Sequence, residues 1–445
     1  MIIGDDFNNQ PLTEAQREAL IERMQTAWAN LPPDQQNQIK PLLDDAHNQF
    51  SQLLTTGRAP DYHVRPILRL KSYLTNDYDG HVESLRARAA AAQAAGAPPA
   101  PATPPPPAAA LQISVGPGGE ILGTGKYEEL DPLWELVAGT VWLENLLHRH
   151  PFPAGEPKTV DIPNQLTIAL AGDFGTGNFG ANDSPSTKIS KFIPTLKPDI
   201  TIHLGDVYYA GTSGEERDKL IPYWPKGSIA SFAMNSNHEM YSGGGPYFNE
   251  TVGGPIFNKL QSPFSFFALE NANWIIVGLD SAYEANVLKL YMDGSIGKTQ
   301  QPAFLRDIAT RANKKKKVVI LTHHEGLQED GDPTHAKPLY GEVMNAFAGF
   351  DPPAYWYWGH VHAGVAYKPL DNGLRCRCAG HGALPWGQAS LLKNSSHVEW
   401  YESRKANDPL NSLRVYNGFV FLQFKDATLS EAFYDETGNV AWQLP

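Results

Sequence analysis

The sequence has very few cysteines and no long apolar stretch. Only Cys376 and Cys378 occur among its 445 residues, which excludes a disulfide-rich scaffold and a zinc site built from thiolates. A disulfide between residues i and i+2 is strained, so we expect both thiols to be free. No run approaches the roughly 18 apolar residues that a membrane span requires.

A secretory signal and an excess of positive charge are also missing. The N-terminus lacks a basic start followed by an apolar core, which predicts a soluble protein that is cytoplasmic or exported by a leaderless route. The 36 Lys and Arg residues against 48 Asp and Glu residues give a formal net charge of -12. Nucleic-acid-binding proteins present a basic surface, so binding to DNA or RNA is not expected.

Composition divides the chain into four regions. The first has the apolar periodicity of a helical hairpin over 12–56 and of a third amphipathic stretch over 62–95. The second is almost wholly Ala and Pro, which favours an extended spacer. In order, the regions are 1–90 (helical), 91–112 (Ala/Pro-rich linker), 113–160 (a connecting segment with a helix over 130–150) and 161–445 (the main domain). The spacer predicts that the N-terminal region is dispensable for chemistry; its protein partner is not predicted.

Short apolar runs alternate with helical patterns in the main domain. The runs are typical of strands buried on both faces. They span 166–171, 200–204, 229–234, 274–279, 317–322 and 355–358. Ser184 and Pro185 suit the start of a helix after the first run, and a second helix is expected over 299–313. Further strands are expected at Arg375–Ala379 and Phe419–Phe424. The alternation predicts an α/β fold.

Chemically active side chains follow five of these six runs. Ligands in open α/β sheets bind beyond the carboxyl ends of strands, so we expect these side chains to converge. They are Asp173 in GDFG, Asp206 and Tyr209 in GDVYY, Asn237 and His238 in SNHE, His323 in LTHH, and His360 and His362 in GHVH. Carboxylates can bridge two ions, and imidazole suits zinc, iron and manganese. The set predicts a site for two metal ions that binds a phosphate.

The five segments resemble those of the metallophosphoesterase superfamily, and specifically the purple acid phosphatases. The family pattern is GDxG, GDxxY, GNH(D/E), VxxH and GHxH, which here covers about residues 165–365. Most metallophosphoesterases have a histidine where this chain has Gly175, and the purple enzymes have a tyrosine at the position of Tyr209. Ser236 departs from the usual glycine of GNH. The resemblance implies a four-layer α/β/β/α sandwich, preceded here by the helical region and the linker.

The resemblance also implies a role for each residue. A ferric ion would be held by Asp173, Asp206, Tyr209 and His362. A divalent ion (iron, zinc or manganese) would be held by Asp206, Asn237, His323 and His360, so that Asp206 bridges the pair. His238 would contact the phosphate together with Asn237 and would act in catalysis. His335 is a second catalytic candidate, and His381 is a substrate-binding candidate.

These roles imply hydrolysis of small phosphate monoesters by in-line attack of a metal-bound hydroxide. Two alternatives stay open. The same site would serve a phosphodiesterase that acts on nucleotides or phospholipid head groups. A non-catalytic interaction protein, with its function in the helical N-terminal region, is the second. Rates on a model monoester and a model diester separate the two enzymes, and metal analysis tests the non-catalytic alternative.

Overall fold

The computed structural model describes residues 14–41, 114–115, 121–122, 132–178, 183–383, 392–393, 395–408 and 414–444. The expected helix over 62–95, the Ala/Pro-rich linker and the hairpin beyond residue 41 lie outside these ranges. Among the described residues, no helix combines the length and the apolar character that crossing a bilayer demands.

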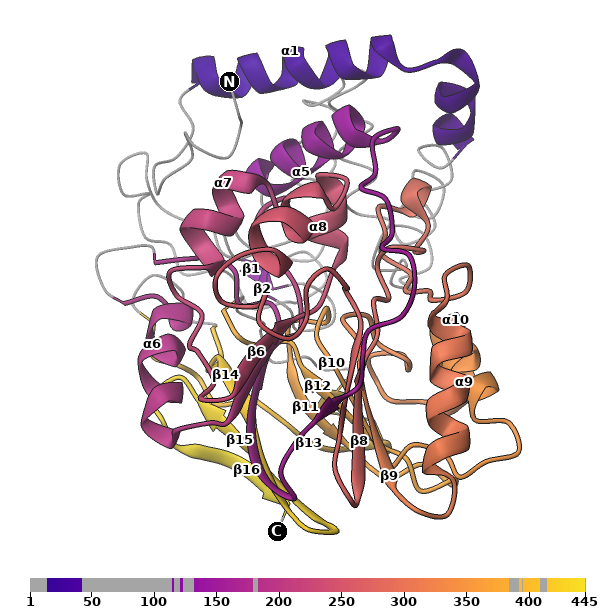
Figure 1. Ribbon diagram of the computed structural model, residues 1–445. Helices are drawn as coiled ribbons and strands as arrows, with labels where there is room; N and C mark the ends of the chain where they lie inside the picture. The colour runs from indigo at the N-terminus through magenta and orange to yellow at the C-terminus, as the bar shows by residue number, and fades with distance from the viewer. Residues whose placement is uncertain are drawn as a thin grey trace.

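Two sheets form the centre of the described structure (Figure 1). In spatial order the eight-stranded sheet contains β13 (Val398–Tyr401), β11 (Gly364–Tyr367), β12 (Arg375–Ala379), β10 (Tyr355–Trp358), β9 (Lys317–Leu321), β8 (Trp274–Gly278), β7 (Phe267–Glu270) and β3 (Val160–Asp161). The six-stranded sheet contains β16 (Val440–Leu444), β15 (Thr428–Asp435), β14 (Gly418–Lys425), β4 (Gln165–Ala171), β5 (Ile200–His203) and β6 (Ala230–Ala233). A separate short pair joins β1 (Ser114–Val115) and β2 (Ile121–Leu122).

The sheets bury an apolar layer between them. Leu170 and Ile202 of the smaller sheet and Leu321 and Tyr357 of the larger one are fully buried in a single cluster. The central strands are parallel: β4 pairs with β5 and β5 with β6, while β8 pairs with β9 and β9 with β10. Strands of this kind are covered on both faces, which is why they appear in the sequence as continuous apolar runs. All six predicted runs are confirmed as strands.

Helices cover the outer faces of both sheets (Figure 1). The larger sheet packs against α9 (Gln301–Ala312) and α10 (Pro338–Ala346), and the smaller one against α6 (Pro185–Phe192). The Ser184 side chain accepts a hydrogen bond from the Thr187 amide, which confirms the predicted start of α6. The predicted four-layer α/β/β/α sandwich is confirmed.

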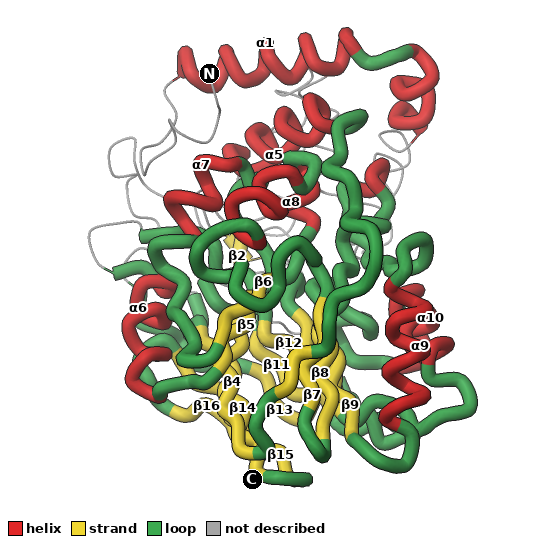
Figure 2. Tube along the Cα trace, viewed as in Figure 1, coloured by secondary structure: helices red, strands yellow, loops and turns green. Residues whose placement is uncertain are grey.

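Short helical segments and loops gather at one end of the strands, where Figure 2 shows α5, α7 and α8 beyond the strand ends. The segments are α7 (Ser213–Glu215), α8 (Asn237–Tyr241) and the 3-10 or π turns η2 (Glu216–Leu220), η3 (Tyr247–Val252), η4 (Val287–Lys289) and η5 (Pro333–His335), whereas the 3-10 turn η1 (Ile193–Leu196) continues α6 toward the start of β5. This end of the sandwich receives the loops that carry the predicted ligands.

The N-terminal helix packs on residues of the main domain, while the division of the chain into four regions stays a prediction. Helix α1 (Glu14–Asn30) and the helix predicted over 130–150, α5 (Pro132–Asn145), contact each other. Leu20 and Met24 of α1 are buried in one apolar cluster with Tyr208 and Tyr241. A second helical segment covers 33–41. Because α1 shares a core with residues beside the predicted site, removing it would expose apolar surface there.

The two cysteines are free, as predicted. Both lie on β12 and are buried. Burial raises the pKa of Cys376 to about 12 and raises that of Cys378 as well, so neither thiol ionises readily.

Candidate metal centre

The predicted ligands lie just beyond the carboxyl ends of five strands. Asp173 follows β4, Asp206 follows β5, Asn237 begins α8 after β6, His323 follows β9, and both histidines of GHVH lie between β10 and β11. None of the seven predicted ligands is more than 4 % exposed. In such an enclosed site, charges act on one another far more strongly than on the protein surface.

Backbone strain is concentrated at these positions. Four predicted ligands have positive φ angles, a conformation that is uncommon for residues other than glycine: Asp173 (58°), Asp206 (79°), His360 (67°) and His362 (49°). Strain of this kind persists only where the surrounding structure imposes it, and it clusters at functional sites. We attribute it to aiming these side chains at a common centre.

Two motif glycines leave room for the ligands. A Cβ atom on Gly359 would lie 2.8 Å from Asp173 Oδ2. One on Gly205, whose φ is +98°, would lie 2.8 Å from His323 Nδ1. Real Cβ atoms do not approach other atoms this closely, so a side chain at either position would displace a predicted ligand.

The first ligand group, which we call the carboxylate group, contains Asp173, Asp206 and His362. One ligand atom from each lies within 4.8 Å of the others. His362 Nε2 is 3.2 Å from Asp173 Oδ1 and 3.9 Å from Asp206 Oδ2. The His360 amide donates to the second oxygen of Asp173 at 2.9 Å, which orients that carboxylate.

A phenol lies in the carboxylate group, and it belongs to Tyr208. Its hydroxyl donates to Asp206 Oδ2 at 2.8 Å and lies 3.3 Å from both Asp173 Oδ1 and His362 Nε2. The ligand predicted from the motif is the next residue, Tyr209. Its carbonyl accepts a hydrogen bond from His238, and its ring lies 5.4 Å from the Lys219 amine.

Sequence reasoning missed Tyr208, although a signal was present. Both tyrosines follow Asp206 in GDVYY, and the motif alone does not say which side chain turns inward. The structure therefore offers Tyr208 as the phenol at this position.

The second ligand group, which we call the histidine group, is centred on His323. Its Nε2 lies 2.9 Å from Asn237 Oδ1, 3.2 Å from His360 Nδ1 and 3.2 Å from Asp206 Oδ1. Its Nδ1 lies 2.8 Å from the Leu204 carbonyl. A carbonyl only accepts, so Nδ1 carries the hydrogen and Nε2 presents its lone pair to the centre.

His324 lies next to this group but supports it without supplying a ligand. One of its ring nitrogens also falls within 4.8 Å of a nitrogen of His323 and of His360. However, Nε2 bonds the Tyr291 carbonyl at 2.7 Å and Nδ1 bonds the Ser281 hydroxyl at 2.9 Å. With both ring nitrogens engaged by the protein, His324 packs beside the centre.

Asp206 joins the two groups through its two oxygens. Oδ1 faces His323, and Oδ2 faces Tyr208 and His362. A carboxylate placed in this way can donate one oxygen to each of two ions. This arrangement fits the bridging role that the sequence predicted for it.

The protonation states also suit metal binding. Burial raises the pKa of Asp206, but His323 and His238 outweigh it and hold that pKa well below its usual range. Burial, followed by the charge of Asp206, raises the pKa of Asp173 to about 6. Burial, followed by His324 and His323, holds the pKa of His360 well below its usual range. Neutral imidazoles and ionised carboxylates are the forms that bind metals, so the donor set fits a pair of ions.

His238 lies beside the centre with a fixed ring. Its Nδ1 donates to the Tyr209 carbonyl at 2.6 Å, and its Nε2 lies 4.0 Å from Asp206 Oδ2. Burial is the largest cause that lowers the pKa of His238, to about 4. The ring therefore presents a neutral Nε2 toward the carboxylate group.

The structure does not bring His335 to the centre. Its side chain is 74 % exposed, and its contacts among the described residues are with Asp332 and Thr334 in its own turn. The buried cluster at the strand ends has no described contact with it. Its catalytic role stays a prediction without structural support.

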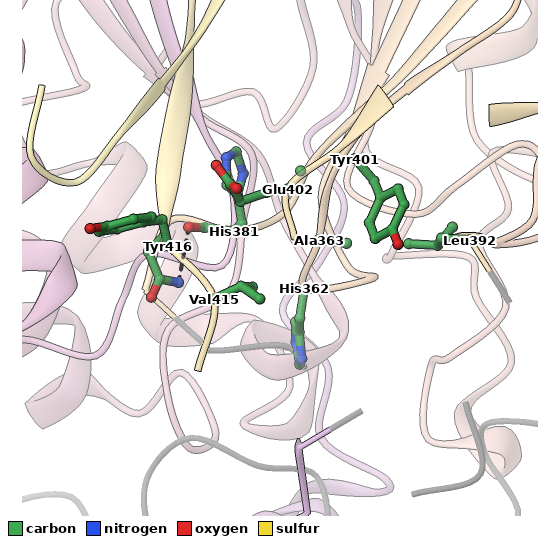
Figure 3. Close-up of a pocket in the computed structure, with 10 residues that line it drawn as sticks. His362, Ala363, His381, Leu392, Tyr401, Glu402, Val415 and Tyr416 are labelled. Carbon is green, nitrogen blue, oxygen red and sulfur yellow. Dashed lines mark hydrogen bonds between the residues drawn. The ribbon is translucent and has the colours of Figure 1, made fainter. Parts of the chain in front are cut away.

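His381 is buried behind His362. The two histidines line one small pocket together with Tyr401 and Glu402, and in Figure 3 their rings point in opposite directions. Burial lowers the pKa of His381 to about 3, and its Nδ1 has no hydrogen-bond partner in the described structure. A substrate contact through His381 also stays a prediction.

A comparison with protein families matches the part of the chain that carries the two ligand groups. The family model for calcineurin-like phosphoesterases matches residues 166–364, a segment that contains every predicted metal ligand. No curated protein matches the sequence.

Several solved structures are similar to this chain, and 63 % of the chain is covered in each of three that illustrate the range. GAP50, the anchor in the inner membrane complex of Plasmodium, is 12 % identical, with 88 % of its chain covered and a TM-score of 0.46. A dimetal phosphatase from Danio rerio is 13 % identical, with 98 % covered and a TM-score of 0.42. Zinc-bound Vps29 from Entamoeba histolytica is 12 % identical, with 98 % covered and a TM-score of 0.28.

These identities and TM-scores are too low to transfer a function to this chain. The family match carries the assignment instead, together with the two ligand groups inside the matched segment. Residues 166–364 therefore form a domain of the calcineurin-like phosphoesterase (metallophosphoesterase) superfamily.

Proposed function

We propose that this chain hydrolyses small phosphate monoesters with a pair of metal ions, in the manner of the purple acid phosphatases. The position of Asp206 is the observation that carries the proposal. Its two oxygens face two separate ligand groups, and both groups are buried at the carboxyl ends of the strands. Paired ion sites that share a carboxylate suit phosphate, because two cations can neutralise its oxygens at once.

Two features favour the purple subtype over other metallophosphoesterases. Gly175 stands where most of the superfamily has a histidine, and a Cβ atom there would lie 2.5 Å from the Asp206 carbonyl oxygen. A histidine ligand therefore has no room at this position. The Tyr208 phenol lies among the remaining ligands of the carboxylate group. A phenolate is a hard donor that favours a trivalent ion such as Fe³⁺.

The ligand sets follow from the two groups. Asp173, Asp206, Tyr208 and His362 would hold the trivalent ion, with Tyr209 as the alternative phenol from the motif. Asp206, Asn237, His323 and His360 would hold a divalent ion such as iron, zinc or manganese. When bound, the ion pair would lower the pKa of a water nucleophile and neutralise charge on the phosphate.

His238 would act on the substrate through its Nε2 atom. The hydrogen bond from Nδ1 to the Tyr209 carbonyl keeps the ring from turning. Because the free ring is neutral, Nε2 would first take up a proton when the anionic substrate binds; it would then donate to a phosphate oxygen or pass that proton to the leaving alkoxide. Asn237 would contribute a neutral amide beside the same phosphate.

Metal analysis and two model substrates test this function together. The purified protein should contain two metal ions per chain and should hydrolyse p-nitrophenyl phosphate faster than bis(p-nitrophenyl) phosphate. Activity should disappear on chelation and return when metal is restored, with the Asp206→Asn variant as the inactive control.

A faster reaction with the diester would establish a phosphodiesterase at the same site. A protein that takes up no metal after incubation with Zn²⁺ or Fe³⁺ would contradict the proposal. That result would favour the non-catalytic alternative, with its function in the N-terminal helices.

A further inference from the structure

Ser236 stands directly before Asn237, where the resembled family has glycine. It is fully buried, and its hydroxyl contacts three groups. It donates to Asp206 Oδ1, accepts from the His238 amide at 3.0 Å, and forms a short hydrogen bond with Glu239 Oε2. A glycine would make none of these contacts.

The number of hydrogens around this hydroxyl fixes the direction of its bonds. A serine hydroxyl offers one hydrogen and two lone pairs. The His238 amide occupies one lone pair, which leaves one hydrogen and one lone pair for two carboxyl groups. An ionised carboxylate only accepts, so Asp206 as a metal ligand takes the hydrogen, and Glu239 must donate to the remaining lone pair.

The oxygen that Ser236 contacts belongs to the histidine side of the bridge. Asp206 Oδ1 lies 3.2 Å from His323 Nε2, while the opposite oxygen contacts Tyr208. A hydrogen bond to one oxygen of a carboxylate directs the lone pair of that oxygen and has less effect on the other. The contact therefore acts on one of the two ligand groups.

We propose that Ser236 is a positioning residue that aims Asp206 Oδ1 at the ion of the histidine group. It holds the oxygen through its hydroxyl while Glu239 and the His238 amide hold the serine. The inference rests on the proposed two-metal function and deepens it. It explains how this chain replaces the family glycine without losing a ligand: the replacement adds a support for the bridge.

The test is a two-site titration of metal-free protein with Zn²⁺, on Ser236→Ala and Ser236→Gly. Partners that orient metal ligands typically contribute about 10–100-fold in metal affinity. We expect a loss of that size in one binding event and no change in the other. His323→Ala identifies the event, because it removes the centre of the histidine group. Ser236→Gly restores the family residue, so it provides a second variant if Ser236→Ala fails to fold.

Ser242→Ala is the matched control. Ser242 ends the same helix, α8, and its hydroxyl bonds the carbonyls of Gly211 and Glu239. The control should lose stability as the Ser236 variants do, yet keep both Zn²⁺ affinities.

Unchanged affinities in both Ser236 variants would overturn the inference, and so would an equal loss in both binding events. Since the measurement is ion binding, it is separate from the test of function. A chain with the selective loss but no phosphatase activity would refute only the proposed function. An active chain without the loss would refute only the role of Ser236.

Discussion

The two ligand groups differ in the chemistry of their donors. The carboxylate group offers two carboxylates, a phenol and one imidazole, from Asp173, Asp206, Tyr208 and His362. The histidine group offers two imidazoles, an amide oxygen and the other oxygen of Asp206. Hard anionic oxygens favour a highly charged ion, whereas imidazoles suit zinc and other divalent ions. The two groups of this one buried site therefore favour metal ions of different charge.

Asp206 is the one side chain that both groups share, so Asp206→Ala should have the largest effect. We expect loss of activity and a metal content of one ion or none, because both groups lose a ligand. Elemental analysis and turnover measure this directly. Asp199→Asn is the control, since Asp199 bonds Thr167 at the other end of β4. Two retained ions in Asp206→Ala would show that the groups are independent.

His238 should affect turnover without affecting either group. His238→Ala is expected to retain both ions and to lose about 10²–10⁴ in turnover, which is typical of acid–base residues. His148→Ala is the matched histidine control and should leave turnover close to that of the unchanged protein, because its side chain is exposed and has no proposed role at the centre. If the His238→Ala variant lost metal, His238 would be a metal ligand and would belong to one of the two groups.

The phenol should distinguish the carboxylate group spectroscopically. A phenolate bound to Fe³⁺ gives a visible charge-transfer band, so the iron-loaded protein should be coloured. Tyr208→Phe removes only the hydroxyl and should abolish that band while the histidine group keeps its ion. Tyr209→Phe should keep the band. The reverse result would restore the assignment made from the motif, and a colourless iron protein would exclude the purple subtype.

The two groups should also differ in their response to acid. Protons compete with an ion for Asp173, whose pKa is raised to about 6, so this carboxyl is mostly protonated below that pH and ionised above it. The affinity of the carboxylate group should therefore fall as the pH drops below about 6, by at most about tenfold per pH unit. Asp206 and His360 have pKa values well below their usual ranges and keep their binding forms.

Zn²⁺ titrations of the metal-free protein on either side of this pH measure the difference. The event that weakens in acid should be the one that remains in His323→Ala. Equal weakening of both events would mean that the two groups titrate together.

The smallest effect on the centre should come from α1. Met24 is fully buried in the cluster that includes Tyr208, so Met24→Ala should lower the free energy of unfolding by about 2–5 kcal/mol. We expect both Zn²⁺ affinities to change little, with any loss in the carboxylate group. Thermal unfolding and titration measure the two effects, with the exposed Glu22→Ala on the same helix as the control. Unchanged stability would support the prediction that the N-terminal region is dispensable.

The strands and the positions of the ligands could be read from the sequence. Strands covered on both faces must be apolar along their whole length, so the runs before Asp173, Asp206 and His323 stand out without any structure. A polar residue just after such a run lies at a sheet edge, where parallel strands bring distant residues together. The start of α6 could also be predicted, because Ser184 and Pro185 affect only the backbone of neighbouring residues.

The orientations of the side chains could not be read in this way. Two neighbouring tyrosines follow Asp206, and only the packed loops decide that Tyr208 enters the carboxylate group. The histidine candidates beyond the strand ends show the same limit: His335 lies in an exposed turn, and the ring of His381 points away from that of His362. The contacts of α1 with Tyr208 and Tyr241 could not be read either, because composition carries no record of what a helix packs against.

The sequence by itself determined the α/β fold class and the residue types at the site, because burial and strand periodicity act over neighbouring residues; the four-layer arrangement came from the family resemblance of the motifs. Only the tertiary structure decided which oxygen of Asp206 faces which group, and that Ser236 holds one of them. Those relations join residues about thirty to more than one hundred positions apart, through hydrogen bonds whose direction depends on three-dimensional placement. No pattern along the chain encodes them.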